Sequence, residues 1–389
     1  MASARGTAEP PARSSVLADD RLWRVLLALA PGAIFLATRV VCLWILAWIA
    51  DLHDKLLMDM LGSWDGLHYV AIAAQGYDWS GVDPEAARSP AFFPGLPWLM
   101  SLVSTVTGDG TERAAGIVVS TVAGLLTAYG LVKLAEFVPG LDRAGGLILV
   151  AVFGLAPMSI VLTMVYSEAL FCAIAVWALV FLLKGNWLAA GGLALLGGLV
   201  RPSGAALAGV VMVAALVAII RHRATWQTWV GAALAPLGAV GWVGYVGWRL
   251  GDLTAWFTLQ REGWHSTFDF GAGTVRFFYR TLKDAPAVLD VVTVGLMIAA
   301  VVLFVLSIQQ KQPYELLLYS AFSLIQVLGS DGVMNSKGRL LIPAFTLLLP
   351  IAVFLNRERR SNAVLGIVLV GLMSCWYSAY AVVIYGYAI

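Results

Sequence analysis

The sequence predicts an all-α integral membrane protein with about eleven transmembrane helices. Hydrophobic residues make up 60% of the 389 residues and charged residues only 12%, which excludes an ordinary soluble domain. The mean hydropathy is +0.84, and many apolar runs approach the ~20 residues that cross a bilayer. Basic residues gather at a few of the polar breaks between these runs, as they do in cytoplasmic loops.

The chain divides into a short tail and one membrane domain. Residues 1–20 are rich in Ala, Pro, Ser and charge, which predicts a disordered cytoplasmic tail. Residues 21–389 are expected to form the polytopic domain. The first apolar run, about 23–50, is too long for a signal-peptide core and lacks a small-residue cleavage site, so we interpret it as a retained first span.

The basic clusters orient the spans. Arg221-His222-Arg223 and Arg357–Arg360, together with Lys184 and Lys311, are expected on the cytoplasmic side with the N-terminus. This orientation makes 51–111 the first extracytoplasmic loop and 249–285 the second, and it leaves the C-terminus outside. The expected spans after the first are 112–136, 145–163, 168–183, 187–200, 205–220, 226–248, 286–308, 314–330, 339–355 and 361–386.

This count requires that residues 92–107 do not cross the bilayer. The segment is short for a span, and Pro94 and Pro97 disfavour a helix through its start, so a juxtamembrane or re-entrant helix is expected. A competing count makes 92–107 a span and joins 187–220 into one broken helix. That alternative places Glu168 on the cytoplasmic side.

The most informative motif is Trp64-Asp65-Gly66, followed by His68-Tyr69, in the first extracytoplasmic loop. A carboxylate between Trp and Gly at a membrane surface suits a catalytic base, because aromatic neighbours partly dehydrate it. Trp64, His68 and Tyr69 are expected to contact the substrate. The alternative is structural: residues 65–75 have the pattern of an interfacial helix, and Asp65 would cap its N-terminus.

Glu168 and Arg201 are further candidates on the same expected side. Glu168 follows Tyr166-Ser167 at the start of a span, where it is either a catalytic residue or a favourable charge in a first helical turn capped by Ser167. Arg201-Pro202-Ser203-Gly204 interrupts an apolar run. An Arg beside helix N-terminal amides suits a phosphate, and the alternative is a plain hairpin turn.

Two later segments are candidates for substrate binding. Gln260, Trp264 and His265 lie in the second loop, where they would either stack on a sugar and bond its hydroxyls or belong to an interfacial aromatic belt. Lys337 and Arg339 are either a second phosphate contact or charges at a helix end that extend to the interface.

The sequence gives no sign of a metal, a cofactor or a nucleic acid. Cys42, Cys172 and Cys375 are an odd, scattered set, and the four histidines lack metal-ligand spacing. A phosphate loop of the GxxxxGK type is absent, which excludes an ATP-driven pump module in this chain. The net charge of +2 is too small to indicate a nucleic-acid partner.

The motifs resemble those of PIG-V-type mannosyltransferases, which comprise GPI mannosyltransferase 2 and its bacterial relatives within the GT-C superfamily. The resemblance rests on Trp64-Asp65-Gly66, on Phe92-Phe93-Pro94 and on Tyr166–Phe171, which is similar to the family's Tyr-Ser-Glu-Ser-Leu-Phe. Arg201–Gly204 resembles the family's Arg-Ser-Asn-Gly and departs from it at two positions. The clear similarity runs from about 64 to 204.

The resemblance implies a GT-C fold, an active site on the extracytoplasmic face and a polyprenyl-phosphate sugar donor, usually of mannose. It implies Asp65 as the catalytic base of an inverting transfer. Spans rich in Ala and Gly, with Arg favoured over Lys, are typical of a high-GC bacterium such as an actinobacterium. The expected partners are therefore the donor, an envelope glycolipid or glycan acceptor, and the lipid bilayer of the cell membrane.

Two alternatives stay open. The broken helix at 201–204 is also a feature of secondary transporters and flippases for lipid-linked sugars. Such a transporter should have paired half-repeats and charges at the membrane midplane, whereas the polar groups here are expected at one face. A GT-C enzyme that transfers another sugar is the second alternative.

Overall fold

The computed structural model describes residues 13–80, 89–284 and 287–386. Within these ranges the chain is helical and contains no strand, although Phe268 and Ser330 pair in an isolated antiparallel bridge. The all-α fold is confirmed. The helices in chain order are α1 (Arg13–Asp51), α2 (Leu57–Leu61), α3 (Asp65–Gln75), α4 (Gly95–Thr107), α5 (Glu112–Ala135), α6 (Arg143–Gly154), α7 (Glu168–Leu183), α8 (Trp187–Gly198), α9 (Gly204–Ile220), α10 (Trp226–Leu234), α11 (Leu237–Leu250), α12 (Ala255–Trp264), α13 (Ala272–Lys283), α14 (Val288–Gln309), α15 (Tyr314–Leu328), α16 (Lys337–Leu340), α17 (Leu349–Arg357) and α18 (Arg360–Val383).

Five helical segments within the described ranges are long and apolar enough to cross a bilayer. They are residues 24–51 of α1, α5, α10 with α11, α14 and α18. The pair 334–340 and 345–357 passes the same test as a sixth, bent by 72°. The other five expected spans coincide with α6, α7, α8, α9 and α15, which have only 12 to 17 residues. A 12-residue helix is about 18 Å long, less than the ~30 Å hydrocarbon core, so the count of eleven is not confirmed.

Helix α4 covers most of residues 92–107, the segment that was expected not to cross the bilayer. It has 13 residues and is too short for a straight span. Its first residue, Gly95, donates its backbone N–H to Leu199 O at 2.8 Å, and a Cβ at Gly95 would lie 2.7 Å from the Val200 side chain. The glycine therefore lets the start of α4 pack against the break that follows α8.

Small residues bring the central helices into close contact. A Cβ at Gly191 of α8 would lie 2.2 Å from Gly231 O of α10, and one at Gly238 of α11 would lie 1.8 Å from Leu195 O. Such backbone approach is how helices associate in lipid, where hydrophobic burial contributes little to their association. Beside them, the buried face of α7 contributes Phe171, Cys172 and Leu179 to the main core.

A buried irregular stretch between α6 and α7 is held by a membrane arginine. Arg39 of α1 is 4% exposed, and its guanidinium donates to the carbonyls of Gly154 and Ser159. These carbonyls belong to the end of α6 and to the 3-10 turn Ser159–Leu162. Arg39 thus satisfies backbone groups that the end of α6 leaves open, and the stretch leads directly into Glu168.

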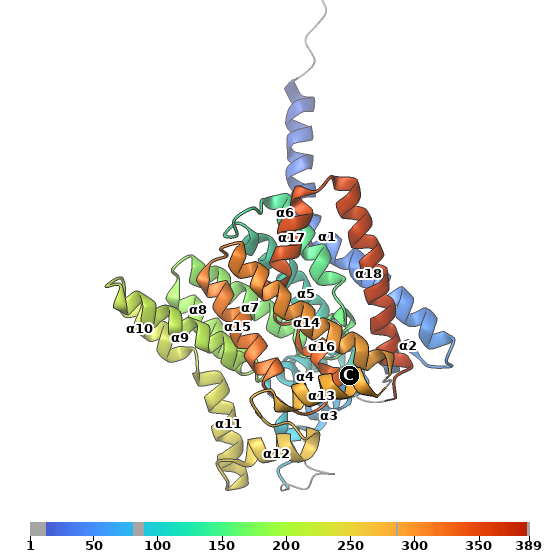
Figure 1. Cartoon of the computed structure of the whole chain (residues 1–389), viewed down its shortest axis with the longest axis vertical. Coiled ribbons are helices and arrows are strands. Elements are labelled where there is room, and N and C mark those ends of the chain that lie inside the picture. The colour runs from blue at the N-terminus through green and yellow to red at the C-terminus, as the bar shows by residue number, and fades with distance from the viewer. Residues whose placement is uncertain (1–12, 81–88, 285–286, 387–389) are drawn as a thin grey trace, which may run out of the picture.

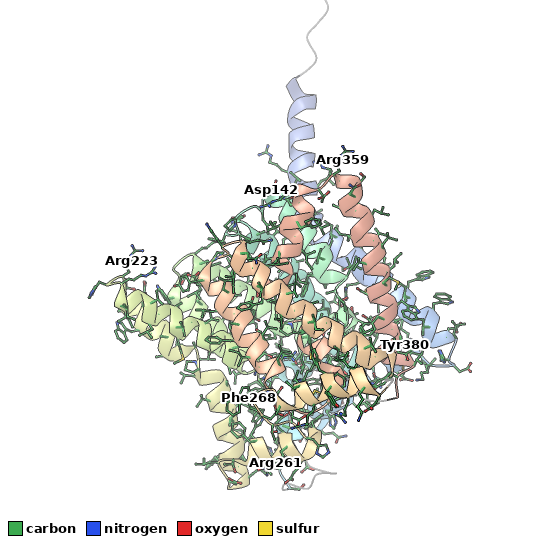
Figure 2. The ribbon with its side chains drawn as sticks, in the orientation of Figure 1. Asp142, Arg223, Arg261, Phe268, Arg359 and Tyr380 are labelled. Carbon is green, nitrogen blue, oxygen red and sulfur yellow. The ribbon has the colours of Figure 1, made fainter. Side chains whose placement is uncertain are left out.

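The labelled residues mark the two ends of the molecule. Asp142 and Arg359 lie at the end where α1 enters the helical body, whereas Arg261 and Phe268 lie at the opposite end (Figure 2). Helices α3, α4, α12, α13 and α16 gather toward that second end (Figure 1). Because α18 begins near Arg359 and passes Tyr380 toward the second end, the described N-terminal and C-terminal helices start and finish at opposite ends.

One expectation differs from the structure. Residues 13–20 were expected in the disordered tail, but they form the start of α1, which continues into the first apolar run. Residues 1–12 lie outside the described residues. Cys42 of α1 and Cys375 of α18 are far apart in the sequence, but their Sγ atoms lie 2.7 Å from each other, and both are free thiols.

Candidate active site

Four charged side chains from distant parts of the sequence form one connected chain of ion pairs. Arg339 NH1 lies 2.7 Å from Asp65 Oδ2, and Arg339 Nε lies 3.5 Å from Glu168 Oε1. Arg201 NH1 lies 2.9 Å from the same Glu168 oxygen. The Glu168 side chain is 2% exposed and that of Arg201 7%, whereas Asp65 is the most exposed of the four at 22%. Asp65 is therefore the acid of this group that an incoming substrate can reach.

Asp65 is the first residue of α3 rather than its cap. The N-cap is Trp64, which has a positive φ of 57° and forms no side-chain cap hydrogen bond. A non-glycine residue with such a backbone is strained, and strain of this kind concentrates at functional sites. The next residue, Gly66, packs under the Val165 carbonyl, where a Cβ would lie 3.4 Å from the oxygen. The Asp65 carboxylate therefore does not serve as the cap of α3, and it pairs with Arg339 instead.

Glu168 and Arg201 are placed by the ends of two helices. Glu168 lies in the first turn of α7, as expected, but Ser167 forms no side-chain cap hydrogen bond there. Arg201 lies in the break between α8 and α9, where its backbone N–H still bonds to Gly197 O at 3.4 Å. Within the described residues, Glu168 Oε2 and Arg201 Nε have no hydrogen-bond partner. Buried polar atoms of this kind are expected to find one in a bound substrate.

The charged chain lines a cavity of about 510 Å³. Asp65 and Glu168 both face it and share the Arg339 guanidinium, which favours the preferred topology, because the competing count puts these two residues on opposite sides of the membrane. One wall is aromatic and comes from the motif at 92–93 and from α12. Another wall is polar and comes from the end of α15 and the segment between α15 and α16, with Gln326, Ser330, Asp331 and Ser336.

Phe92 organises the aromatic wall. Its ring stacks on His68 with centroids 4.9 Å apart and meets the edges of Tyr69 at 5.0 Å and Trp264 at 5.4 Å. Gln260 of α12 donates its side-chain amide to Ala91 O at 3.2 Å, as does the indole of Trp256. Helix α12 is therefore fastened to the segment that precedes α4.

Tyr69 is a neutral hydrogen-bond donor beside the carboxylates. It is 6% exposed and lines the cavity. Burial raises the pKa of Tyr69 well above its usual range, and the nearby Asp65 and Glu168 raise it further, although a hydrogen bond with Ser167 acts in the opposite direction. The phenol consequently keeps its proton at any physiological pH.

Lys337 is a structural brace more than a free cation. The residue is 1% exposed, and its ammonium donates to Thr274 Oγ1 at 2.7 Å, Val327 O at 2.9 Å and Ser330 O at 2.7 Å. These three acceptors use all three donors of the ammonium. Lys337 thereby ties α13 and the end of α15 to α16.

The structure gathers most of the residues that the sequence singled out. Eight of them line the cavity: Asp65, Tyr69, Glu168, Arg201, Gln260, Trp264, Lys337 and Arg339. Trp64, His68 and His265 do not line it. Trp64 packs partly buried against the main core, His68 lies behind Phe92, and His265 ends α12 in the left-handed region with an exposed side chain.

Sequence reasoning missed the polar wall. Asp331 Oδ1 accepts the N–H of Gly332 at 2.8 Å, and its Oδ2 lies 3.4 Å from Arg276. The backbone N–H of Asp331 donates to Thr267 O at 2.7 Å. The one available signal was the polar interruption at 329–336 between two apolar runs. Among the described residues, no cluster of three or more His, Cys, Asp or Glu could hold a metal ion.

Two comparisons bear on this site. The family model described as Mannosyltransferase (PIG-V) matches residues 21–224, more than half of the chain. This range contains Asp65, Glu168 and Arg201 and ends before Arg339. None of the curated proteins compared with the chain matches it.

Proposed function

This chain belongs to the mannosyltransferase (PIG-V) family, and from that premise we propose the reaction it carries out as a multi-pass membrane glycosyltransferase. It transfers one sugar, mannose, from a polyprenyl-phosphate donor to an envelope glycolipid or glycan. The transfer inverts the anomeric carbon and takes place at the extracytoplasmic face of the cell membrane. The observation that carries the proposal is the Asp65–Arg339–Glu168–Arg201 chain on the wall of one cavity.

Asp65 is the base. It is the more exposed of the two carboxylates, so an acceptor hydroxyl can reach it. The hydroxyl oxygen bonds to the anomeric carbon while Asp65 takes its proton. The bond between that carbon and the phosphate oxygen breaks, and its electron pair leaves with the polyprenyl phosphate. The proton remains on Asp65 until it passes to solvent.

Arg201 and Arg339 receive the phosphate. Both guanidinium groups line the cavity, and Arg201 Nε is a buried donor without a hydrogen-bond partner among the described residues. Positive charge placed where the leaving phosphate gains negative charge stabilises the transition state. The phosphate also competes with Asp65 for Arg339, which would release the carboxylate for the acceptor hydroxyl.

A donor with a single phosphate suits these residues. A phosphate monoester is already a stable anionic leaving group, so neither a general acid nor a metal that neutralises a pyrophosphate is required. Glu168 lies between the two guanidinium groups, where it holds them in place. We therefore assign Glu168 a positioning role and reserve the base for Asp65.

The distribution of charge supports the proposed extracytoplasmic placement. Arg223 and Arg359 belong to the basic turns that favour the cytoplasm, and Arg261 and Phe268, which line the cavity, lie away from them (Figure 2). Lipid-linked donor and glycolipid acceptor would both enter at that side from the bilayer.

Glycolipid profiling tests the proposal. The glycolipids and glycans of a strain that lacks this chain are compared by mass spectrometry with those of its parent. We expect one species to lose a single hexose and to regain it with the wild-type chain, but not with an Asp65→Asn chain of equal abundance. An unchanged profile, or full restoration by Asp65→Asn, would argue against the proposal.

A further inference from the structure

Helix α13 has three distinct stripes along its surface. Thr274, Phe277 and Thr281 are buried, and Phe277 packs with Val294 and Met297 of α14. A second stripe is apolar and exposed: Val275 is 69% exposed, Tyr279 65% and Leu282 82%. A third stripe is basic and exposed: Arg276, Arg280 and Lys283. Both exposed stripes follow the i, i+4, i+7 spacing of one helix face.

This helix must lie close to the membrane surface. Helix α13 ends at Lys283 and α14, one of the five long apolar segments, begins at Val288. Five residues reach at most about 17 Å, so α13 cannot leave the neighbourhood of the bilayer. Because its buried stripe packs on α14, the other two stripes face lipid and water. A helix with exposed apolar and basic stripes at this depth is typical of one that lies in the interface.

We propose that α13 is a binding site for anionic phospholipid headgroups. Val275, Tyr279 and Leu282 enter the acyl-chain boundary, and Arg280 and Lys283 bind the headgroup phosphates. Salt bridges between described residues include Arg276, which pairs with Asp269 and Asp331, but neither Arg280 nor Lys283. Lys283 Nζ lies 6.0 Å from the centre of the Tyr279 ring, a contact that uses none of its N–H donors, so both cations near the C-terminal end can donate to a headgroup phosphate.

Lipid bound at α13 would hold one wall of the cavity at a fixed depth in the bilayer. Thr274 of α13 accepts a hydrogen bond from Lys337, and Arg276 pairs with Asp331. Lys337 and Asp331 both line the cavity. A headgroup bound along α13 therefore fixes the polar wall of the cavity at the depth of the lipid phosphates. This adds to the proposed function without depending on it, because lipid binding requires no turnover.

A local fluorescence measurement tests the site. Leu282→Cys, in a background with Ala at the three native cysteines, is labelled with a fluorophore in nanodiscs of phosphatidylcholine. A nitroxide on the acyl chain near the headgroup then quenches the label, either on phosphatidylglycerol or on phosphatidylcholine at equal mole fraction. Each Lys or Arg near an anionic surface favours binding by about fivefold. We therefore expect severalfold stronger quenching by the phosphatidylglycerol probe.

Matched variants assign the effect to α13. Arg280→Gln with Lys283→Gln should bring the two probes to equal quenching. Arg359→Gln with Arg360→Gln, which removes two cations at the other end of the molecule, should leave the preference intact. The proposal is overturned if neither probe quenches, if both quench equally in the wild-type chain, or if the preference survives loss of Arg280 and Lys283. Asp65→Asn should retain the preference, so a failure of the catalytic proposal gives a different result.

Discussion

Arg339 is the residue on which the two carboxylates depend. Its guanidinium bonds to Asp65 and approaches Glu168, and it also lies 4.8 Å from the centre of the Tyr166 ring. A cation that is buried and shared between two acids and an aromatic face is costly to remove, because each acid loses its partner. The positions of these side chains therefore depend on all of their contacts together and not on any single ion pair.

Asp65→Asn is expected to separate chemistry from structure. The amide keeps the side-chain shape and can still accept the hydrogen bond from Arg339, but it cannot take a proton. We expect transfer by purified enzyme to fall by at least ~10², while thermal stability and donor binding change little. Near-normal transfer by Asp65→Asn would leave only a structural role for this position, since Asn can replace Asp as a hydrogen-bond acceptor for Arg339 but not as a base.

Arg201→Ala is expected to weaken donor binding and to destabilise the protein. Removal of one partner from a buried pair costs about 3–5 kcal/mol, because Glu168 then keeps only the longer contact with Arg339. Adding Glu168→Gln should recover most of the melting temperature without recovering affinity for the polyprenyl-phosphate sugar. Recovery of both together would mean that Arg201 acts through folding alone.

Transfer should not require a metal. The substrate proposed here carries one phosphate, and two guanidinium groups line the cavity where that phosphate would leave. Purified enzyme is expected to keep full activity in excess EDTA. Loss of activity on chelation, with recovery on addition of Mn²⁺ or Mg²⁺, would redirect attention to Asp65 and Glu168 as ligands.

Sequence reasoning located the acids of the site but not their connection. Asp65 and Arg339 are 274 positions apart, and neither periodicity nor spacing relates residues at that distance. Gln260 and Lys337 line the same cavity as Asp65, but their side chains already bond to Ala91 and to the α13–α15 region. Whether a polar group is available to a substrate depends on its burial and on its existing partners, and the local sequence shows neither.

At the level of helices, composition predicted the elements better than it predicted their lengths. Residues 65–75 were expected as a helix and form α3 with Leu67 exposed and Ile72 buried. The apolar run at 145–163 was expected to cross the bilayer, but α6 ends at Gly154. There the buried Arg39 donates a hydrogen bond to the Gly154 carbonyl. A hydropathy pattern does not reveal such a break, because the residues in it are as apolar as those of a helix.

Gly238 is expected to be essential for the contact between α11 and α8. A Cβ there would lie 1.8 Å from Leu195 O, whereas a Cβ at Gly241 of the same helix meets nothing within 4 Å. Gly238→Ala should therefore lower the melting temperature, since overpacking costs ~1–3 kcal/mol. Gly241→Ala should leave it unchanged or slightly higher. Equal effects of the two substitutions would contradict the close approach of these helices.

At the level of the whole molecule, the two ends define an orientation. The polar turns near Asp142 and Arg359 lie apart from the loops that carry Arg261 and Phe268 (Figure 2). The distribution of basic residues predicts which turns face the cytoplasm. The meeting of Asp65 and Glu168 at one cavity favours the preferred count over the alternative that charge alone left open.

Cysteine labelling should report this orientation. Single cysteines at Asp109, Phe268 and Arg223, all exposed positions, are introduced into a chain whose native cysteines are replaced by Ala. An impermeant maleimide should label the first two in intact cells and the third only after lysis. The reverse pattern would invert the topology, and opposite behaviour of Asp109 and Phe268 would contradict a common face.

The span of sequence that separates Arg339 from Asp65 has a consequence for biogenesis. Chains are synthesised from the N-terminus, so Glu168 and Arg201 can pair as soon as α8 has emerged from the ribosome. Asp65, inserted much earlier, has to wait for α16 before it acquires its guanidinium partner. A chain released prematurely, before residue 339, would carry the matched family motifs but an unpaired acid. The ion pair of Asp65 can thus form only after residue 339 has been made, long after the acid itself has been inserted.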